Sequence, residues 1–249
     1  MRLSVVIPTR NDATALARTL GALDALPERG AIEVVVAAWG DRPGTTGAVA
    51  GRARLVWLEA STRAALMNAG AAAARGDTLL FLHADSIPPR DGVALIRRAL
   101  DDPRVVGGAF EHRFAEDRWS LRAITAINRV RYRLTRHYYG DQGIFVRAAV
   151  FRDLGGYRDL AVLEDLDLTR RLKRVGRSVL IRVPLVTSGR RFLARGPWRT
   201  LGFIVWLLML YTLGRDTERY AERWRGPGDR PPGHPWPRDL AGAHRVRAG

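Results

Sequence analysis

Short apolar runs alternate with helical patterns over residues 1–90 of the chain. The runs have the length and composition of strands buried on both faces of a parallel sheet, and they are Leu3–Ile7, Ile32–Ala37, Leu55–Leu58 and Leu79–Leu82. One helix is expected from the N-cap Asp12 to about Leu26. A second is expected from Thr62 to Arg75, with Ser61 as its N-cap and Gly76 at its end. Strands that alternate with helices predict βαβ units with right-handed crossovers.

The pattern changes after residue 90, where longer amphipathic stretches occur. Helices are expected at Asp91–Leu100, Leu121–Leu134 and Glu164–Val175, and strands at Val105–Phe114, Gly143–Val146 and Ser178–Val183. Gly107 and Gly108 interrupt the first of these strands, which indicates a bulge or a close approach of ligand or backbone. The helix at 121–134 has an apolar stripe with arginines between its members, and packing against the core explains that stripe.

The most apolar run of the chain is Leu201–Leu213. Its 13 residues are too few to span a bilayer, which needs about 20. It is either a helix buried in the core or a helix lying in a membrane interface, where the rings of Trp198, Trp206 and Tyr211 would suit the boundary between lipid and water. Residues 225–249 are rich in Gly, Pro, Arg and His, and we expect a disordered tail there.

Composition limits the classes of protein that the chain can be. With 249 residues, 47% of them hydrophobic, it can build a substantial core. The absence of cysteine excludes disulfides and thiolate metal sites and fits a reducing compartment. The first residues lack the apolar segment and cleavage site of a signal peptide, so we expect them to open the fold. The net charge of +16 indicates anionic partners such as phosphates, acidic lipid or nucleic acid, and a solvated arginine-rich surface is the alternative.

Asp85 follows the apolar run 79–82 closely, with His83 beside it. Ligands of parallel sheets bind beyond the carboxyl ends of the strands, so the two residues stand where a metal or cofactor would bind. The alternative is that Asp85 only caps a turn formed by Ser86–Pro89.

Two further acidic clusters occur later in the chain. Asp141 and Gln142 lie in a turn before the strand at 143–146. Glu164 and Asp165 open the helix at 164–175, where the helix dipole favours acidic residues for structural reasons alone.

Four segments, VVIPTRND, LHADS, YGDQGIFVR and GGYRDLAVLEDLDLTRRLKRVGR, occur in this order along the chain. Together they resemble the family 2 glycosyltransferases, which are inverting enzymes with the GT-A fold. MNAGA, FLHAD, GDQGIFVR, LEDLDL and VTSGRRF are most similar to a small bacterial group associated with radical-SAM/selenium-domain proteins. Each motif alone is weak, and the resemblance rests on their order over about residues 3–220.

The resemblance implies a nucleotide-sugar donor, carrying UDP or GDP, and a divalent metal, Mn²⁺ or Mg²⁺. Asp85 would hold the metal, with His83 as a candidate second ligand, and the metal would neutralise the charge that develops on the leaving diphosphate. The residues that the resemblance assigns to donor binding are Pro8, Thr9, Asn11, Asp12, Arg63 and Ala84.

The resemblance also implies a general base for the acceptor hydroxyl, and Asp165 matches that position. Glu164 beside it would raise the pKa of Asp165 by repulsion, whereas the helix N-terminus would lower it. Asp141 and Gln142 match positions that bind the acceptor or sugar hydroxyls. Arg190 and Arg191 are candidates for a phosphate clamp, with a surface role as the alternative.

The chain departs from the family at the end of the second strand. The family usually has an Asp there that contacts the nucleobase or ribose, and this chain has Ala38. Trp39 stacking on a base and Asp41 reaching round to it are two ways in which the contact would be replaced. Donor identity is therefore open.

These observations predict an α/β protein with the GT-A fold, in which a Rossmann-like, mostly parallel central sheet is flanked by helices and followed by C-terminal helices. Residues 1–224 would form one domain. Within it, 1–90 form the nucleotide-sugar-binding half, 91–195 the acceptor and catalytic half, and 196–224 the C-terminal helices. We expect a metal-dependent, inverting glycosyltransferase in the cytoplasm. It would be peripheral at the inner face of the membrane and act on a lipid-linked acceptor if the run at 201–213 is interfacial.

Three alternatives are weighed against this function. A non-catalytic or altered-specificity sugar-nucleotide binder is motivated by Ala38, and the retained Asp85, Glu164 and Asp165 argue against it. A nucleotidyltransferase lacks support because there is no Gly-rich lysine loop and Lys173 is the only lysine. A nucleic-acid-binding protein would account for the charge, but no recognition element is visible, so no nucleic-acid partner is expected.

Overall fold

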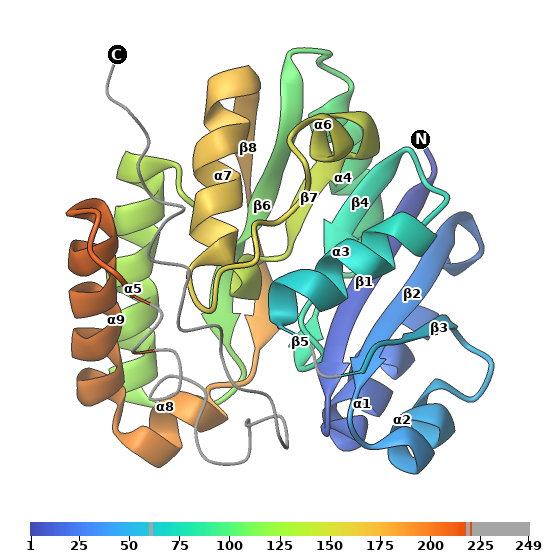
Figure 1. Ribbon diagram of the computed structural model, residues 1–249, viewed down its shortest axis with the longest axis horizontal. Coiled ribbons are helices and arrows are strands. Elements are labelled where there is room, and N and C mark those ends of the chain that lie inside the picture. The colour runs from blue at the N-terminus through green and yellow to red at the C-terminus, as the bar shows by residue number, and fades with distance from the viewer. Residues whose placement is uncertain (60–61, 218–219, 221–249) are drawn as a thin grey trace.

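The computed structural model describes residues 1–59, 62–217 and 220, and the predicted tail at 225–249 lies outside them. Within these residues an eight-stranded sheet in the order β3-β2-β1-β4-β7-β6-β8-β5 has helices on both faces (Figure 1). The strands are β1 (Leu3–Arg10), β2 (Ile32–Trp39), β3 (Arg54–Trp57), β4 (Thr78–Phe81), β5 (Ser86–Ile87), β6 (Val105–Phe114), β7 (Ile144–Arg147) and β8 (Arg177–Thr187). The α-helices are α1 (Ala13–Asp24), α2 (Arg42–Val49), α3 (Arg63–Ala73), α4 (Gly92–Leu100), α5 (Trp119–Thr135), α6 (Ala148–Asp153), α7 (Glu164–Val175), α8 (Arg190–Arg195) and α9 (Pro197–Thr212).

The sheet is parallel in its N-terminal half and mixed in the rest. β1 pairs in parallel with β2 and β4, and β2 pairs in parallel with β3. β7 runs antiparallel to both β4 and β6, whereas β8 runs parallel to β6 and antiparallel to the short β5. The predicted α/β class is therefore confirmed. Among the described strands, every antiparallel pair involves β7 or β8.

The strands of the parallel half are apolar on both faces because a hydrophobic core lies on each side. Along β1, Val5 and Ile7 belong to a core that includes residues of α1 and α4, while Val6 belongs to a second core that includes residues of α3, α6 and α7. Both cores exclude water almost completely, since Val6 and Ile7 are fully buried. This two-sided burial is the physical reason for the unbroken apolar runs in the sequence.

Several predicted boundaries move in the structure. Thr62, not Ser61, is the N-cap of α3: its hydroxyl accepts a hydrogen bond from Ala65 N at 3.1 Å, and Ser61 lies outside the described residues. The helix ends at Ala73 and Gly76 does not close it. The stretch that follows Asp85 is not only a turn, because Ser86–Ile87 forms β5 on β8.

The glycine pair in β6 allows a close approach of backbone, as its position in the strand suggests. A Cβ on Gly108 would lie 2.1 Å from the Val179 carbonyl oxygen, and one on Gly107 would lie 2.5 Å from that of Phe145. The strand register shifts between Val105 and Gly107. The glycines therefore let β7, β6 and β8 pack without side chains between them.

Core packing does not explain the whole apolar stripe of α5. Leu121 and Ile124 are buried, but Ile127, Val130 and Leu134 are 46, 60 and 79% exposed. Towards its C-terminal end the helix therefore presents apolar side chains to solvent, which corrects the expectation from sequence.

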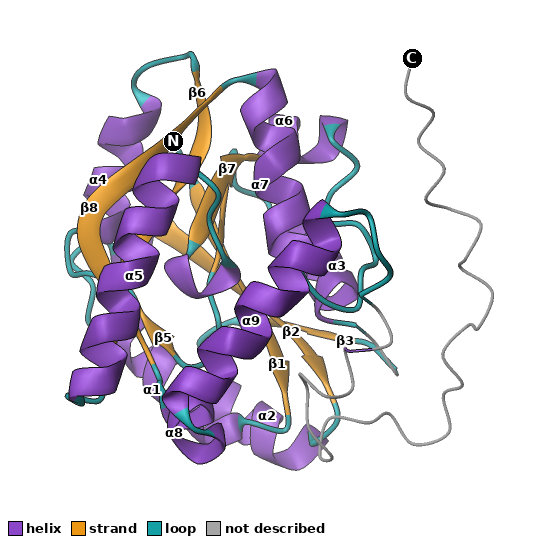
Figure 2. Ribbon diagram, turned by 90° about the vertical axis from the view of Figure 1, so that its left-hand side faces the viewer, coloured by secondary structure: helices purple, strands orange, loops and turns teal. Residues whose placement is uncertain are grey.

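The run at 201–213 is not a core helix either. Within α9 only Thr200 and Leu207 are buried, and the helix lies on the surface beside α5 (Figure 2). None of the helices in the described part of the chain is long and apolar enough to cross a membrane.

Replacing Gly108 by Ala should lower the free energy of unfolding by about 1–3 kcal/mol, because the new methyl group meets backbone that can move only if the sheet opens. Urea unfolding of the purified variant measures this. Gly21→Ala is the matched control: it lies in α1 with nothing within 4 Å of the added Cβ, and it should gain up to about 1 kcal/mol. Equal effects of the two substitutions would contradict the close approach.

Candidate active site

The predicted site residues gather into two ion-pair clusters at the carboxyl ends of the parallel strands. The first, called the base cluster here, consists of Arg63, His83, Glu164 and Asp165. The second, called the cation cluster, consists of Asp12, Asp85 and Arg190. The loop after β4 contributes to both, through His83 and Asp85. These seven residues come from segments far apart in the sequence.

Arg63 is the centre of the base cluster. Its Nε donates to Glu164 Oε1, its Nη1 lies 2.8 Å from His83 Nε2, and its Nη2 lies 3.4 Å from Asp165 Oδ2. The resemblance assigns Arg63 to the donor, whereas in the structure its guanidinium faces the two carboxylates that open α7. Its first role is thus to neutralise a pair of acids that are 3 and 7% exposed.

Asp165 has the environment of a proton acceptor. Its Oδ2 accepts a hydrogen bond from Gly140 N and its Oδ1 accepts one from Leu166 N, both at 2.7 Å. Burial and the negative charge of Glu164 raise the pKa of Asp165 to about 6, although Arg63 and the two hydrogen bonds act in the opposite direction. A carboxyl group whose pKa lies near the operating pH suits general base catalysis.

The third acid of the first turn of α7 differs from the other two. Asp167 forms ion pairs with Arg171 at 2.7 Å and with Arg158 at 3.4 Å, so its role is structural.

Leu163, the residue before the helix, has a φ of +63°, which is uncommon for a side chain of this size. Strained backbone of this kind concentrates at functional sites.

His83 is held in one protonation state by its neighbour. Arg63 can only donate, so Nε2 of His83 accepts and the ring proton is assigned to Nδ1. Burial and the charge of Arg63 keep the pKa of His83 well below its usual value. The predicted role of His83 as a metal ligand would require this contact to break.

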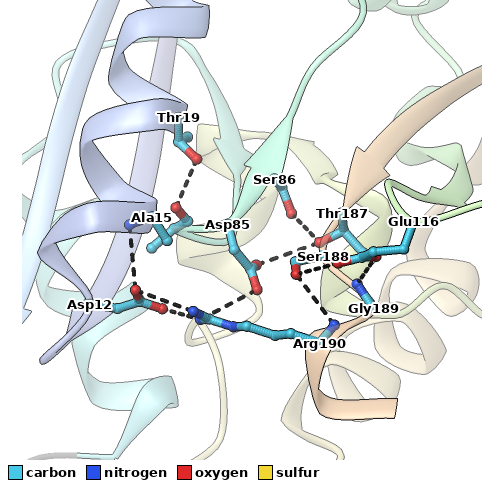
Figure 3. Close-up of polar contacts among 11 residues, drawn as sticks. Asp12, Ala15, Thr19, Asp85, Ser86, Glu116, Thr187, Ser188, Gly189 and Arg190 are labelled. Carbon is cyan, nitrogen blue, oxygen red and sulfur yellow. Dashed lines mark hydrogen bonds and ion pairs between the residues drawn. The ribbon is translucent and has the colours of Figure 1, made fainter. Parts of the chain in front are cut away.

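The cation cluster is shown in Figure 3. Arg190 donates to both carboxylate oxygens of Asp12, and its Nη2 lies 3.7 Å from Asp85 Oδ2. Burial raises the pKa of Asp85, while the positive charges of Arg190 and Arg191 act in the opposite direction. Asp12 also caps α1 through Ala15 N at 3.4 Å, as the sequence predicts.

Short hydrogen bonds fix the backbone around this cluster. Thr19 donates to the Ala84 carbonyl at 2.7 Å, which ties α1 to the loop that carries Asp85. Glu116 accepts from Ser188 Oγ at 3.0 Å and from Gly189 N at 2.6 Å, which fixes the turn before α8 (Figure 3). The three segments that carry Asp12, Asp85 and Arg190 are thus held in place independently of any ligand.

The first residues assigned to donor binding lie in β1 and just after it. Pro8 and Thr9 belong to β1 itself, which extends past the predicted end at Ile7, and both are buried. Asn11, with φ of +49°, accepts a hydrogen bond from Asp41 N at 2.7 Å and so fixes the loop after β2.

The neighbourhood of Ala38 narrows the ways in which the missing carboxylate is replaced. Ala38 is fully buried and packs in the core. Trp39 is 9% exposed, with the Arg10 guanidinium 3.8 Å from its ring centroid, so little ring surface is left for a base. Asp41 is exposed and caps α2 through Gly44 N at 3.1 Å.

The motif GDQG forms a turn that touches the base cluster. A Cβ on Gly140 would lie 2.5 Å from His83 Nε2 and 3.4 Å from Asp165 Oδ2. Gln142 is buried, and its amide bonds the Phe110 carbonyl and Tyr139 N, both at 3.0 Å. It therefore shapes the turn, whereas the side chain of Asp141 is 33% exposed and can meet a ligand.

His112 in β6 belongs to the same region and has no signal in the sequence. It is 2% exposed, and neither ring nitrogen has a hydrogen-bond partner in the described part of the chain. Its Nε2 lies 3.6 Å from Asp141 Oδ2. Only the fold brings these two residues together, because they stand in different segments of the sequence.

Comparison with solved structures finds the same fold in glycosyltransferases. The mannosyltransferase PcManGT from Pyrobaculum calidifontis, in complex with GDP-Man and Mn²⁺, matches with a TM-score of 0.59 and 21% identity over 75% of this chain and 56% of that one. S. aureus TarS 1–349 matches with a TM-score of 0.57 and 15% identity over 76% of this chain and 61% of that one. The same TarS fragment in complex with UDP-GlcNAc matches with the same TM-score and identity. The predicted GT-A fold is confirmed.

Both of these proteins are longer than the part that matches, since this chain covers less than two thirds of either. Comparison with curated protein sequences finds no match. The family model described as glycosyl transferase family 2 matches residues 4–153, which is more than half of the chain. The chain therefore belongs to glycosyl transferase family 2.

Proposed function

We propose that the chain transfers a sugar, with inversion, from a nucleoside-diphosphate donor to an acceptor hydroxyl. The observation that carries the proposal is Asp165, a buried carboxylate with a raised pKa at the same edge of the sheet as Asp85. The ligands of the similar structures support a donor of this class, since PcManGT is in complex with GDP-Man and TarS with UDP-GlcNAc or UDP. The retained acids at both clusters argue against a purely binding role.

The chain offers Asp165 as the base. As the acceptor oxygen attacks the anomeric carbon, its proton would pass to the Asp165 carboxylate. Attack from the side opposite the leaving diphosphate inverts the anomeric centre. Arg63 stays beside the pair of acids and keeps Asp165 ionised near neutral pH, because it opposes the effects of burial and Glu164.

The residues of the cation cluster fit a divalent metal. The Asp12 and Asp85 carboxylates both contact one positively charged group, Arg190, so the site already favours a cation. Carboxylate oxygens are the ligands that Mg²⁺ and Mn²⁺ prefer. When bound, the metal would neutralise charge on the leaving diphosphate. The Mn²⁺ in the PcManGT complex supports this assignment.

An acceptor presented at a membrane would account for the surface of α5 and α9. Six exposed apolar side chains lie on these two neighbouring helices, three on each, and we call them the apolar surface: Ile127, Val130, Leu134, Val205, Met209 and Leu213. Trp119 and Trp198, 67 and 46% exposed, lie where the two helices begin, with their rings tilted by 45° and the ring centroids 5.8 Å apart. Residues 118–136 contain six arginines and no acid. Apolar and basic surface together suit an anionic membrane, and the acceptor would then be lipid-linked.

A thermal-shift panel of UDP, GDP, ADP, CDP and dTDP, with and without Mn²⁺ or Mg²⁺, tests the proposed function. The correct nucleotide should raise the free energy of unfolding by about 2.7 kcal/mol at 100 times its Kd. If no nucleotide stabilises the protein under any metal condition, the proposed function is wrong.

Asp85→Asn should abolish the metal-dependent part of this stabilisation, because the amide keeps the shape of the carboxylate but not its charge. Titration calorimetry of the identified nucleotide with Mn²⁺ measures the loss. Asp101→Asn, an exposed carboxylate at the end of α4, is the control and should bind as the wild type does. Unchanged metal dependence in Asp85→Asn would rule out this residue as the metal ligand.

Asp165→Asn should lower kcat by about 10²–10⁴-fold while donor affinity stays within about twofold, since the amide cannot take the proton. The wild-type kcat/KM should decrease as the pH is lowered past an apparent pKa near 6, because only the ionised carboxylate accepts a proton. Asp167→Asn is the control in the same turn: it should lower stability more than kcat, since Asp167 is paired with two arginines.

Asp165 should also affect how the free energy of unfolding depends on pH. The pKa of Asp165 is higher in the folded protein than its ordinary value of about 3.9, so the folded state binds the proton more tightly. The free energy of unfolding should therefore fall as pH rises from about 4 to 6, and Asp165→Asn should remove that part of the slope. A slope that is identical in the two proteins would contradict the raised pKa.

The double substitution Val205→Ser, Met209→Ser should weaken binding to anionic vesicles by about tenfold or more, because two exposed apolar side chains no longer enter the lipid. Cosedimentation with phosphatidylserine vesicles at low and high salt measures this, and wild-type binding should itself weaken at high salt. Val175→Ser, a side chain 51% exposed at the end of α7, is the control. If the wild type stays in solution at low salt, the membrane proposal is wrong.

A further inference from the structure

The most distinctive feature of the cation cluster is that the chain itself supplies a cation there. Two carboxylates from different segments, Asp12 and Asp85, share the guanidinium of Arg190 (Figure 3). The closer contact is with Asp12, which the resemblance assigns to donor binding. Asp12 is turned instead toward the carboxylate expected to hold the metal. The two acids would repel each other if no positive charge stood between them.

Arg190 is attached so that its backbone is fixed while its side chain can move. The turn before α8 is held by Glu116, and Arg190 N donates to Ser188 Oγ at 3.3 Å. The side chain itself is 58% exposed. Ion pairs of an exposed arginine contribute modestly to stability, so a ligand of higher charge can compete with this one. Arg63, whose partners are buried, is the contrasting case.

We propose that Arg190 is the resident counter-ion of the metal site: it holds Asp12 and Asp85 together when no donor is bound, and an incoming divalent cation displaces it. The released guanidinium then binds the donor's diphosphate. This inference rests on the proposed function and adds two assignments to it. Asp12 becomes the second carboxylate of the metal site, and Arg190 changes partner between the free and the donor-bound states.

Electrostatics makes the exchange favourable only when both ligands arrive. A divalent cation alone must compete with Arg190 for two carboxylates, and it leaves the arginine without its partners. A diphosphate supplies new partners for the released guanidinium, whose planar fork matches phosphate oxygens. Metal and diphosphate should therefore each raise the affinity for the other by the same factor, as linkage requires.

The experiment measures Mn²⁺ binding without nucleotide, by electron paramagnetic resonance of free Mn²⁺, and then nucleoside-diphosphate binding at saturating Mn²⁺, by calorimetry. The variants are Arg190→Gln, Arg191→Gln and the double variant Asp12→Asn, Arg190→Gln. Arg191 is adjacent to Arg190, and its positive charge also acts on Asp85. Arg191→Gln removes this charge. It therefore controls for the general effect of lowering the local positive charge.

Arg190→Gln should bind Mn²⁺ alone at least tenfold more tightly than the wild type, because the competitor is gone, and Arg191→Gln should change it less than threefold. Adding Asp12→Asn should reverse the gain, because one of the two carboxylates is lost. At saturating Mn²⁺, Arg190→Gln should bind the nucleoside diphosphate at least tenfold more weakly. The factor by which metal and diphosphate strengthen each other should shrink accordingly.

The proposal is overturned if Arg190→Gln binds Mn²⁺ no more tightly than the wild type, including the case in which neither binds measurably, or if Arg191→Gln has the same effect. It is also overturned if the wild type binds nucleotide in EDTA and Arg190→Gln does not, since Arg190 would then replace the metal. None of these results contradicts the proposed function as long as the wild type binds a nucleotide, with or without metal. Absence of any nucleotide binding by the wild type would instead reject that function.

Discussion

Burying two adjacent carboxylates requires a cation beside them, and in this protein Arg63 meets that requirement. Glu164 and Asp165 open α7 with almost no exposed surface, and Arg63 reaches both from the start of α3. Without the guanidinium, the two negative charges would be uncompensated in a region of low dielectric. The ion pair also joins α3 to α7, the helix that carries Asp165. The position of Asp165 relative to the loop after β4 therefore depends on it.

The two clusters use the same chemistry with different burial, and burial decides what each can do. Arg63 pairs with two carboxylates whose side chains are buried, so exchange with solvent or ligand would leave charges unpaired. Arg190 pairs with carboxylates that are 24 and 25% exposed, where water and ligands have access. The fixed charge of Arg63 lowers the pKa of Asp165 and so limits the rise that burial and Glu164 cause. In the proposed exchange, the accessible Arg190 would leave the two acids when a divalent cation binds.

Local rules predict some elements to the residue and fail where tertiary packing decides. The strand Val105–Phe114 and the helix Glu164–Val175 have the predicted bounds, because β-branched residues, acids at the helix start and Gly176 after its end are all local signals. The end of β4 at Phe81 and the strand Ser86–Ile87 escape such rules, since both depend on pairing with distant strands.

The same distinction holds in the site. Motif order identifies Asp85, Glu164 and Asp165 as acids of interest, but nothing local indicates that Arg63 contacts Glu164 and Asp165 or that Arg190 bridges Asp12 and Asp85. Those contacts join residues 101 and 178 positions apart. The surroundings of Ala38, which stands where the family usually has an Asp, also become visible only in the structure. Its methyl group packs in the core, and Asn11 and Asp41 are engaged in holding the loop above it. Under the proposed function, the charged side chains of the cation cluster would contact the metal and the diphosphate, the part that all nucleotide-sugar donors share.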